Sequence, residues 1–305
     1  MSSQEKALLV GDNPFHGISH LSQERSRVRG DTPTSPEYAA KLVSIAVENG
    51  ANGFMFSVSN TTLSILKILN ENGVVEHLDL YGIVPYAYEY VRMASQKGGV
   101  PGLAKTVAKE ILFSGNFGTV VSGLNGVLRA KPISLMKAYL AYEISRIKSA
   151  TGKNARLSCV LLHQLVTDVC LGFNLDWLFR AYVDFMMDKG IMPGFNTGNF
   201  AFLVNKFREW CINLEEVIIV APFNKVGFQM VPSKEKCEKT LAALPRPNVV
   251  AISIMAAGYL QPIEAIKYIA GLSNIRGVAV GISKEKHANE TFKLLVHYLG
   301  ENLWH

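Results

Sequence analysis

One stretch decides the fold of this chain, Leu157-Ser-Cys-Val-Leu-Leu-His-Gln164. Its apolar run is rich enough in branched side chains for a fully buried β-strand, and it ends abruptly in two polar residues. A helical pattern over 134–149 precedes the run, and another from about 176 to 189 follows it. A buried strand between two helices, with polar residues at its carboxyl end, is the repeating unit of an α/β barrel or of a doubly wound sheet.

The same unit recurs along the chain. Further strands are predicted at 7–10, 53–58, 78–84, 192–195, 217–221, 249–255 and 277–280, and a helical pattern follows each of them, with helices beginning near 35, 61, 133, 176, 199, 234, 263 and 286. Eight strands alternating with eight helices favour a single (β/α)8 TIM barrel over residues 1–305. A doubly wound sheet would also use eight buried parallel strands, but the even spacing and the absence of Gly-x-Gly-x-x-Gly after the first strand favour the barrel.

The alternation of strands and helices is interrupted between about residues 88 and 130. This region holds a helical piece at 104–112 and a stretch punctuated by Gly and Asn at 113–126. We interpret it as an insertion between the third strand and the following helix, either a lid over the barrel mouth or an excursion on the surface.

Composition narrows the class of protein. The chain is 49% hydrophobic and 18% charged, which suits a large core, and no linker divides it. The formal charge of +6 comes from scattered basic residues rather than from a stripe with interleaved aromatics, so nucleic-acid binding is not predicted, whereas an anionic small-molecule ligand fits. The four cysteines have no metal spacing, and neither a signal peptide nor an apolar run of about 20 residues is found. We therefore expect a soluble cytoplasmic protein without membrane contact; the oligomeric state stays open.

Polar side chains gather after the predicted strands, at the end where barrel enzymes carry their active sites. The alternative interpretation is that loops are simply polar. Four of these residues are candidates for catalysis: Asp12, His16, Tyr86 and His163. The candidates for substrate binding are Asn13, His20, Asn60, Gln164, Asn196, Asn199, Asn224 and Lys225.

We compare three kinds of chemistry for these candidates: acid–base catalysis, metal binding and glycoside hydrolysis. His163 suits acid–base work, because an imidazole titrates near neutral pH, or it caps the strand end. Asp12 with His16 and His20 raises the possibility of a metal, but Asn13-Pro and Gly17 argue against the helix that would align both imidazoles, and no metal site is predicted. Carboxylates are too scarce at this end for glycosidase chemistry.

A phosphate site is a further candidate, at the junction of the last strand and the last helix. The sequence there reads Gly281-Ile-Ser-Lys-Glu-Lys-His287. Backbone amides at a helix N-terminus, together with Ser283, Lys284 and Lys286, suit an anionic group. An ordinary helix cap with solvated lysines is the alternative.

The second half of the chain resembles the aldo-keto reductase barrel. Val160-Leu-Leu-His163 is similar to that family's fourth strand, whose His is catalytic, and Gly194-Phe-Asn-Thr-Gly-Asn-Phe200 stands in the place of its fifth strand. Pro222-Phe-Asn224 is similar to the sixth-strand end, and 281–291 resembles the final strand and helix that grip the cofactor's phosphate. The resemblance implies NADP as cofactor, bound by Tyr259, Ser283, Lys284 and Lys286.

The first half departs from this pattern. The family has an Asp at the second strand end, a Tyr soon after it and a Lys at the third strand end, where this chain has 57–60, 61–63 and Val84-Pro-Tyr86. Of the four catalytic positions only His163 is retained. The opening Gly11-Asp-Asn-Pro-Phe-His-Gly-Ile-Ser-His20 resembles a signature of barrel proteins without a known reaction.

Three hypotheses follow. The first is a small-molecule enzyme on an aldo-keto-reductase-like barrel, NADP-dependent, with an altered acid–base set at His163, His16, Asp12 and Tyr86. The second is a lyase, isomerase or hydrolase that uses the same histidines on a phosphorylated or carboxylated substrate, with or without a metal. The third is a catalytically inert barrel that serves as a binding module.

Overall fold

The fold is a closed barrel of eight parallel strands, as the sequence predicts. The computed structural model describes residues 6–17, 34–85, 132–246 and 248–300. The strands pair in chain order, and β1 closes the barrel against β8. The barrel consists of β1 (Ala7–Gly11), β2 (Gly53–Ser57), β3 (Asp79–Val84), β4 (Arg156–Leu162), β5 (Met192–Asn196), β6 (Ile218–Pro222), β7 (Val249–Ile252) and β8 (Ile275–Gly281).

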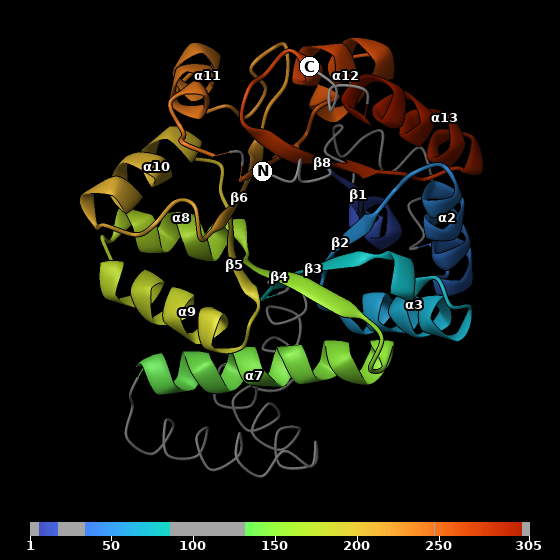
Figure 1. Ribbon diagram of the computed structural model, residues 1–305, viewed down its shortest axis with the longest axis horizontal. Helices are drawn as coiled ribbons and strands as arrows, with labels where there is room; N and C mark the ends of the chain where they lie inside the picture. Colours follow the sequence, from blue (N-terminus) through green and yellow to red (C-terminus); the bar gives the residue numbers. More distant parts are fainter. Residues whose placement is uncertain (1–5, 18–33, 86–131, 247, 301–305) are drawn as a thin grey trace.

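An outer ring of helices surrounds this barrel (Figure 1). The α-helices of the described ranges are α2 (Pro36–Glu48), α3 (Asn60–Glu71), α7 (Pro132–Thr151), α8 (Gln164–Gly172), α9 (Asp176–Asp188), α10 (Phe200–Glu209), α11 (Lys234–Ala242), α12 (Pro262–Ala270) and α13 (Glu285–Leu295). Short turns of 3-10 helix lie at η1 (Asn13–His16), η2 (Val75–His77) and η3 (Ala256–Gly258), and η4 (Val296–Gly300) is a π-helical turn.

Two layers of apolar side chains hold the barrel together. Alternate strand residues point inward, because successive side chains of a strand face opposite ways. The interior cluster contains Leu9, Met55, Tyr81, Cys159, Leu161, Ile218, Val220, Val250 and Ala279. The other strand residues face the helices, where Phe54, Phe195 and Phe207 are fully buried. Both faces of each strand are therefore apolar, which explains the unbroken hydrophobic runs in the sequence.

The structure corrects two predicted elements. The strand that was expected to run to Gln164 ends at Leu162, because His163 caps a helix, α8, that the sequence did not indicate. The seventh strand was expected to reach Met255 but ends at Ile252, because the chain turns at Ser253, whose φ is 53°. The predicted insertion at 88–130, and the candidates His20 and Tyr86, lie outside the described residues.

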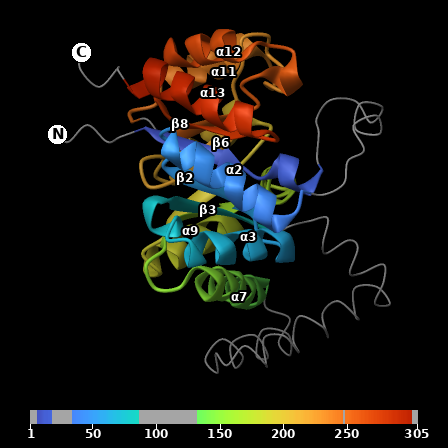
Figure 2. The same ribbon diagram turned by 90° about the vertical axis from the view of Figure 1, so that its right-hand side faces the viewer.

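Side-on, the barrel is a short cylinder with helices such as α2 and α3 lying against its wall (Figure 2). The helices α3, α8, α10 and α13 each begin within four residues of the end of the strand before them. Side-chain caps fix the starts of other helices. Ser35 accepts a hydrogen bond from the Tyr38 amide at the start of α2, and Ser233 accepts one from Lys236 at the start of α11. The strand–helix loops thus lie at one end of the barrel.

Candidate active site at the carboxyl end of the barrel

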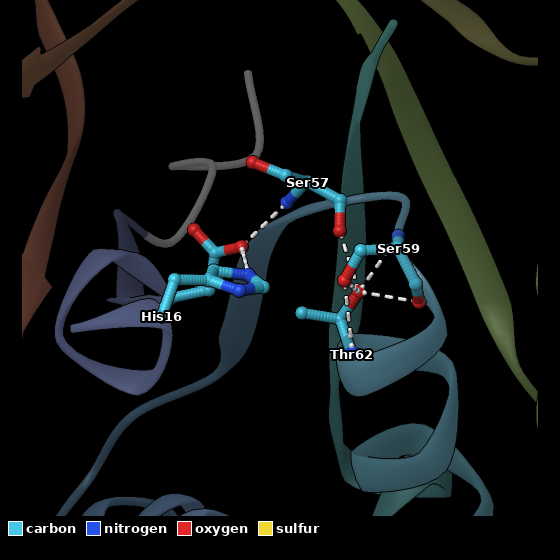
Figure 3. Close-up of polar contacts among 5 residues, drawn as sticks. His16, Ser57, Ser59 and Thr62 are labelled. Carbon is cyan, nitrogen blue, oxygen red and sulfur yellow. Dashed lines mark hydrogen bonds and ion pairs between the residues drawn. The ribbon is translucent and has the colours of Figure 1, made fainter. Parts of the chain in front are cut away.

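A buried carboxylate–imidazole pair lies where β1 ends. His16 Nε2 donates a hydrogen bond to Asp12 Oδ2 over 3.1 Å, and the two side chains are only 7% and 4% exposed. Asp12 Oδ2 also accepts the backbone amide of Ser57, at the end of β2, over 2.7 Å. The carboxylate therefore ties the loop after β1 to the neighbouring strand and fixes the imidazole ring (Figure 3). A carboxylate that orients a histidine in this way is a common arrangement for proton transfer.

The local sequence explains why this loop has its shape. Asn13-Pro begins one turn of 3-10 helix, and Gly17 ends it with φ of 68°, a left-handed conformation that glycine adopts readily. The turn returns the chain so that His16 lies over Asp12, four residues earlier. The residue that His16 contacts in this loop is therefore Asp12.

A second hydrogen-bond network lies next to this pair, at the start of α3. The Ser59 side chain accepts the Thr62 amide over 3.2 Å, while Thr62 Oγ1 accepts the Ser59 amide over 3.0 Å. Thr62 Oγ1 also donates to the Ser57 carbonyl over 2.5 Å. This capping box holds the Ser57 backbone that donates to Asp12 (Figure 3). We call Asp12, His16, Ser57, Ser59 and Thr62 the β1–β2 rim.

The end of β8 packs against the same loop. A Cβ added to Gly281 would lie 2.8 Å from Cγ of Pro14, so glycine allows the Pro14 ring to approach the strand. Gly281 is also the first residue of the candidate phosphate loop, in which Ser283, Lys284 and Lys286 are exposed. Lys284 is the N-cap of α13 and its side chain makes no capping hydrogen bond, whereas Lys286 lies 3.8 Å from Glu290.

His163 lies at a second group of polar residues, after β4 and β5. Its Nδ1 accepts the Leu165 amide over 3.2 Å, so this histidine is the N-cap of α8. Because Nδ1 is the acceptor, the neutral ring carries its proton on Nε2 and can donate a hydrogen bond. Burial lowers the pKa of His163 below its ordinary value, which favours that neutral form. The structure thus combines the two interpretations of His163, since a capping residue can still donate from Nε2.

Asp168 is a residue that the sequence analysis missed. It accepts the Thr197 hydroxyl over 2.5 Å and the Gly198 amide over 3.1 Å, and Thr197 in turn accepts the Asn199 amide over 2.9 Å. This side chain from α8 therefore holds the loop after β5. The only signal in the sequence was an acidic residue close to a strand end. That signal did not indicate a partner for Asp168, because α8 was not predicted. We call His163, Gln164, Asp168, Thr197 and Gly198 the β4–β5 rim.

Asn196, the last residue of β5, carries a buried acceptor. Within the described residues, its Oδ1 has no hydrogen-bond partner. Asn196 lies four residues after Met192, which packs against the interior cluster, so strand alternation places it on the inner face of the barrel. A buried unsatisfied acceptor costs about 1–3 kcal/mol, so a bound group that donates to it would be favoured. Asn199 caps α10 without a side-chain hydrogen bond.

Six other candidates either bind groups outside the two rims or are exposed. Asn60 Oδ1 accepts Arg146 of α7 over 2.8 Å, in the outer layer. The Asn224 amide binds the Phe228 backbone through both of its polar atoms. Lys225 Nζ pairs with Glu264 of α12 over 2.6 Å. Tyr259, after β7, is 78% exposed, and Asn13 and Gln164 are also exposed.

The end of the third strand carries an apolar residue on the inner face of the barrel. Ile83 pairs in register with Ser57 on one side and Leu161 on the other, and it belongs to the interior cluster.

Within the described ranges, no group of three or more His, Cys, Asp and Glu side chains is arranged to hold a metal ion. No helix in those ranges is long and apolar enough to cross a membrane.

These features define a (β/α)8 barrel with a histidine-containing polar site at its carboxyl end. No family model matches the sequence, and no curated protein matches it. Among solved structures, the chain is similar to "the putative aldo-keto reductase from Pseudomona aeruginosa", with a TM-score of 0.58 and 12% identity, over 97% of this chain and 91% of that one. It is also similar to dispersin B, with a TM-score of 0.50 and 11% identity, over 97% and 98% of the two chains. Identities this low show the fold alone, and the resemblance to an aldo-keto-reductase-like barrel is confirmed at that level.

Proposed function

We propose that this protein is a small-molecule enzyme in which His16, held by Asp12, transfers a proton to or from the substrate, and that its reaction is the NADPH-dependent reduction of a carbonyl group. The observation that carries the proposal is the buried Asp12–His16 pair at the carboxyl end of the barrel. Reduction of a carbonyl requires a proton for the oxygen, and the usual Tyr–Lys source is missing from the positions after β2 and β3.

His16 suits this role because of its geometry. The hydrogen bond to the buried Asp12 carboxylate prevents the imidazole ring from turning. Since Nε2 donates to Asp12, proton exchange with the substrate would run through Nδ1. His163 on the β4–β5 rim would donate a hydrogen bond from Nε2 to a second polar group of the substrate, as its neutral state allows. The Asp12–His16 pair thus supplies the proton, while His163 holds the far end of the substrate.

The residues present fit the cofactor at two points. The unpartnered Oδ1 of Asn196 would accept the N–H of a carboxamide such as that of nicotinamide. Ser283, Lys284 and Lys286, around the start of α13, would hold the anionic phosphate end. When bound, the cofactor supplies a hydride. Asn199 remains a candidate for substrate contact on the loop after β5.

Binding and turnover test the proposal separately. Titration of NADPH into the protein, followed by nicotinamide fluorescence, should saturate below about 0.1 mM, a range typical of metabolite sites. Lys284→Met should weaken this binding by about tenfold if it removes one charge-assisted contact. Lys239→Met, an exposed lysine on α11, is the control. An absence of binding at millimolar NADPH would exclude the redox reaction.

His16→Gln tests the proton donor. The glutamine retains a donor for Asp12 but cannot exchange a proton, so kcat for reduction of an aldehyde panel should fall by about 10²–10⁴-fold with little change in the NADPH dissociation constant. His163→Gln should raise KM more than it lowers kcat. If His16→Gln kept full activity, the assignment of the proton donor would be wrong.

A second function is favoured by the end of the third strand. Its described residues, Ile83-Val84-Pro85, include no lysine, so proton transfer lacks that group of a reductase site. A lyase or isomerase that acts on a carboxylated or phosphorylated substrate needs only the histidines and an anion-binding loop. Deuterium incorporation from solvent into α-protons of keto acids, measured by NMR, tests it. Loss of exchange in His16→Gln without NADPH binding would support this alternative, and inactivity in both assays would support an inert binding barrel.

A further inference from the structure

The outer helical layer contains a cleft that the proposed reaction does not use. It lies between α11 and α12, has a volume of about 560 Å³, and is lined by Lys225, Lys234, Ile263, Glu264, Lys267 and Tyr268. Volumes of this size are typical of pockets for small organic ligands. None of these residues belongs to the interior cluster or to either rim of the barrel mouth.

Its charge is unbalanced. Three lysines face a single glutamate in the lining, and they come from three separate segments, the loop after β6, α11 and α12. Lys225 is neutralised by Glu264, and Lys234 lies 3.8 Å from Glu238. Lys267 has no carboxylate within ion-pairing distance in the part of the chain that the structure describes; its Nζ lies 5.4 Å from the centre of the Tyr298 ring. The positive charge of Lys267 is thus not neutralised by a carboxylate of the described residues.

The first turns of two helices add to this field. Lys234 is the first residue of α11, and Ile263 and Glu264 are the second and third residues of α12. The amino end of a helix carries partial positive charge from its unpaired amides. The N-cap of α12, Gln261, makes no side-chain capping hydrogen bond. The backbone amides at the helix starts therefore add to the positive potential that the lysine side chains create in the cleft.

The walls are held in place, as a binding site requires. Asn224 is fully buried, and its side-chain amide binds both backbone groups of Phe228, which fixes the loop that carries Lys225. Tyr268 donates its hydroxyl to Glu238 over 2.6 Å, so its ring has a fixed position. Burial, and then this hydrogen bond, raise the pKa of Tyr268 well above its ordinary range. Ile263, which is partly exposed, adds a second apolar surface.

From this combination we infer that the α11–α12 cleft is a second ligand site, which binds a small organic anion: a phosphate, sulfate or carboxylate carried on a compact aromatic or aliphatic body. The anionic group pairs with Lys267, and with Lys225 or Lys234 as they exchange their carboxylate partners. The apolar body lies against Ile263 and the Tyr268 ring. The site is independent of the barrel mouth, and the inference does not depend on the proposed reaction.

A fluorescent anion tests the inference, with 1-naphthyl phosphate as the probe. Titrated against the full chain, it should bind saturably with a dissociation constant below about 1 mM, as the weakest specific ligands do. Lys267→Met should weaken binding by about tenfold, the usual effect of one lost charge-assisted contact. Ile263→Asp should weaken it further, because it removes apolar surface and adds a negative charge. Circular dichroism should show that both variants, which change surface residues, remain folded.

Matched controls separate the possible sources of binding. Lys239→Met removes a charge from α11 outside the cleft and should leave the affinity unchanged. Lys284→Met, at the barrel mouth, should also leave it unchanged, and NADPH should not displace the probe. 1-Naphthol should bind at least tenfold more weakly, since it lacks the phosphate. Equal affinity for 1-naphthol, an unaltered affinity in Lys267→Met, loss of binding in Lys284→Met, or the absence of saturable binding would each overturn the inference.

Discussion

His16 and His163 both lie at the carboxyl end of the barrel, but the β1–β2 rim and the β4–β5 rim hold them by different chemistry. His16 is bonded to a buried carboxylate that is itself fixed by the backbone of the next strand. His163 is bonded to a backbone amide of its own helix, and no carboxylate contact of its ring is found within the described ranges. The first environment fixes the ring of His16 through Nε2, whereas burial in the second lowers the pKa of His163 and favours its neutral ring. The first histidine is thus oriented by a carboxylate, and the second is suited to donate a hydrogen bond.

The two rims are also separated in space. In the closed order of strands, β3 lies between them on one side and β6, β7 and β8 on the other. A substrate that reached both histidines would therefore span the barrel mouth. The comparison shows that the mouth is not a uniform ring of polar groups, although its residues look alike in the sequence.

The largest effect on stability is expected from Asp12→Ala. This change leaves the buried Ser57 amide and the His16 ring without their acceptor, at a cost of about 2–4 kcal/mol. Asp168→Ala on the other rim also removes two hydrogen bonds, but Asp168 is only partly buried, so water can replace it at a cost of about 1–2 kcal/mol. Urea unfolding of both variants measures the difference. If Asp168→Ala were the more destabilising change, the ranking of the two rims would be reversed.

A pair of glycines allows a finer comparison. A Cβ on Gly281 would lie 2.8 and 2.9 Å from ring carbons of Pro14, whereas a Cβ on Gly198 would lie 2.6 Å from Nε2 of Gln164. The proline ring is fixed to the backbone of η1, but the end of an exposed glutamine side chain can rotate away. Gly281→Ala should therefore destabilise the protein by about 1–3 kcal/mol, and Gly198→Ala by less than about 0.5 kcal/mol.

The readout for this pair is the unfolding free energy together with the NMR shifts of the His16 ring. We expect the shifts of His16 to change in Gly281→Ala and to stay constant in Gly198→Ala, since only the first substitution pushes the 3-10 turn that carries His16. Equal effects of the two substitutions would contradict a rigid β1–β2 rim.

The barrel itself could be predicted from the sequence because its strands are buried on both faces. Continuous apolar runs and glycine-bearing turns follow directly from that burial. Helix α8 could not be predicted, because Val166, Thr167 and Val169 are branched residues that disfavour an isolated helix. It forms because His163 caps it and because Thr167 Oγ1 donates to the Leu162 carbonyl. Without α8, the function of Asp168 stayed hidden.

The candidate site was predicted less completely for a related reason. Position after a strand says which end of the barrel a residue occupies, but not which way its side chain points. Asn60 is turned to Arg146, which is 86 residues away, and Lys225 to Glu264, which is 39 residues away. Such partners are fixed only by the tertiary structure. Asp12 and His16, by contrast, are four residues apart within one turn, so a local pattern sufficed to mark them as candidates.

The smallest effect concerns the pH dependence of stability on the β4–β5 rim. The pKa of His163 is lowered in the folded state, so between its folded value and about 6.5 the unfolded chain binds more protons than the folded one. Stability from this residue is therefore present above about pH 6.5 and is lost as the pH falls through the folded pKa, where protonation of Nδ1 would also remove the acceptor for the Leu165 amide. The urea midpoint of the wild-type chain should be lower at pH 5 than at pH 7.5. The midpoint of His163→Asn, which can cap α8 without titrating, should decrease less over the same pH range. A larger pH dependence in His163→Asn than in the wild type would mean that the folded state stabilises the imidazolium of His163, which would contradict the prediction.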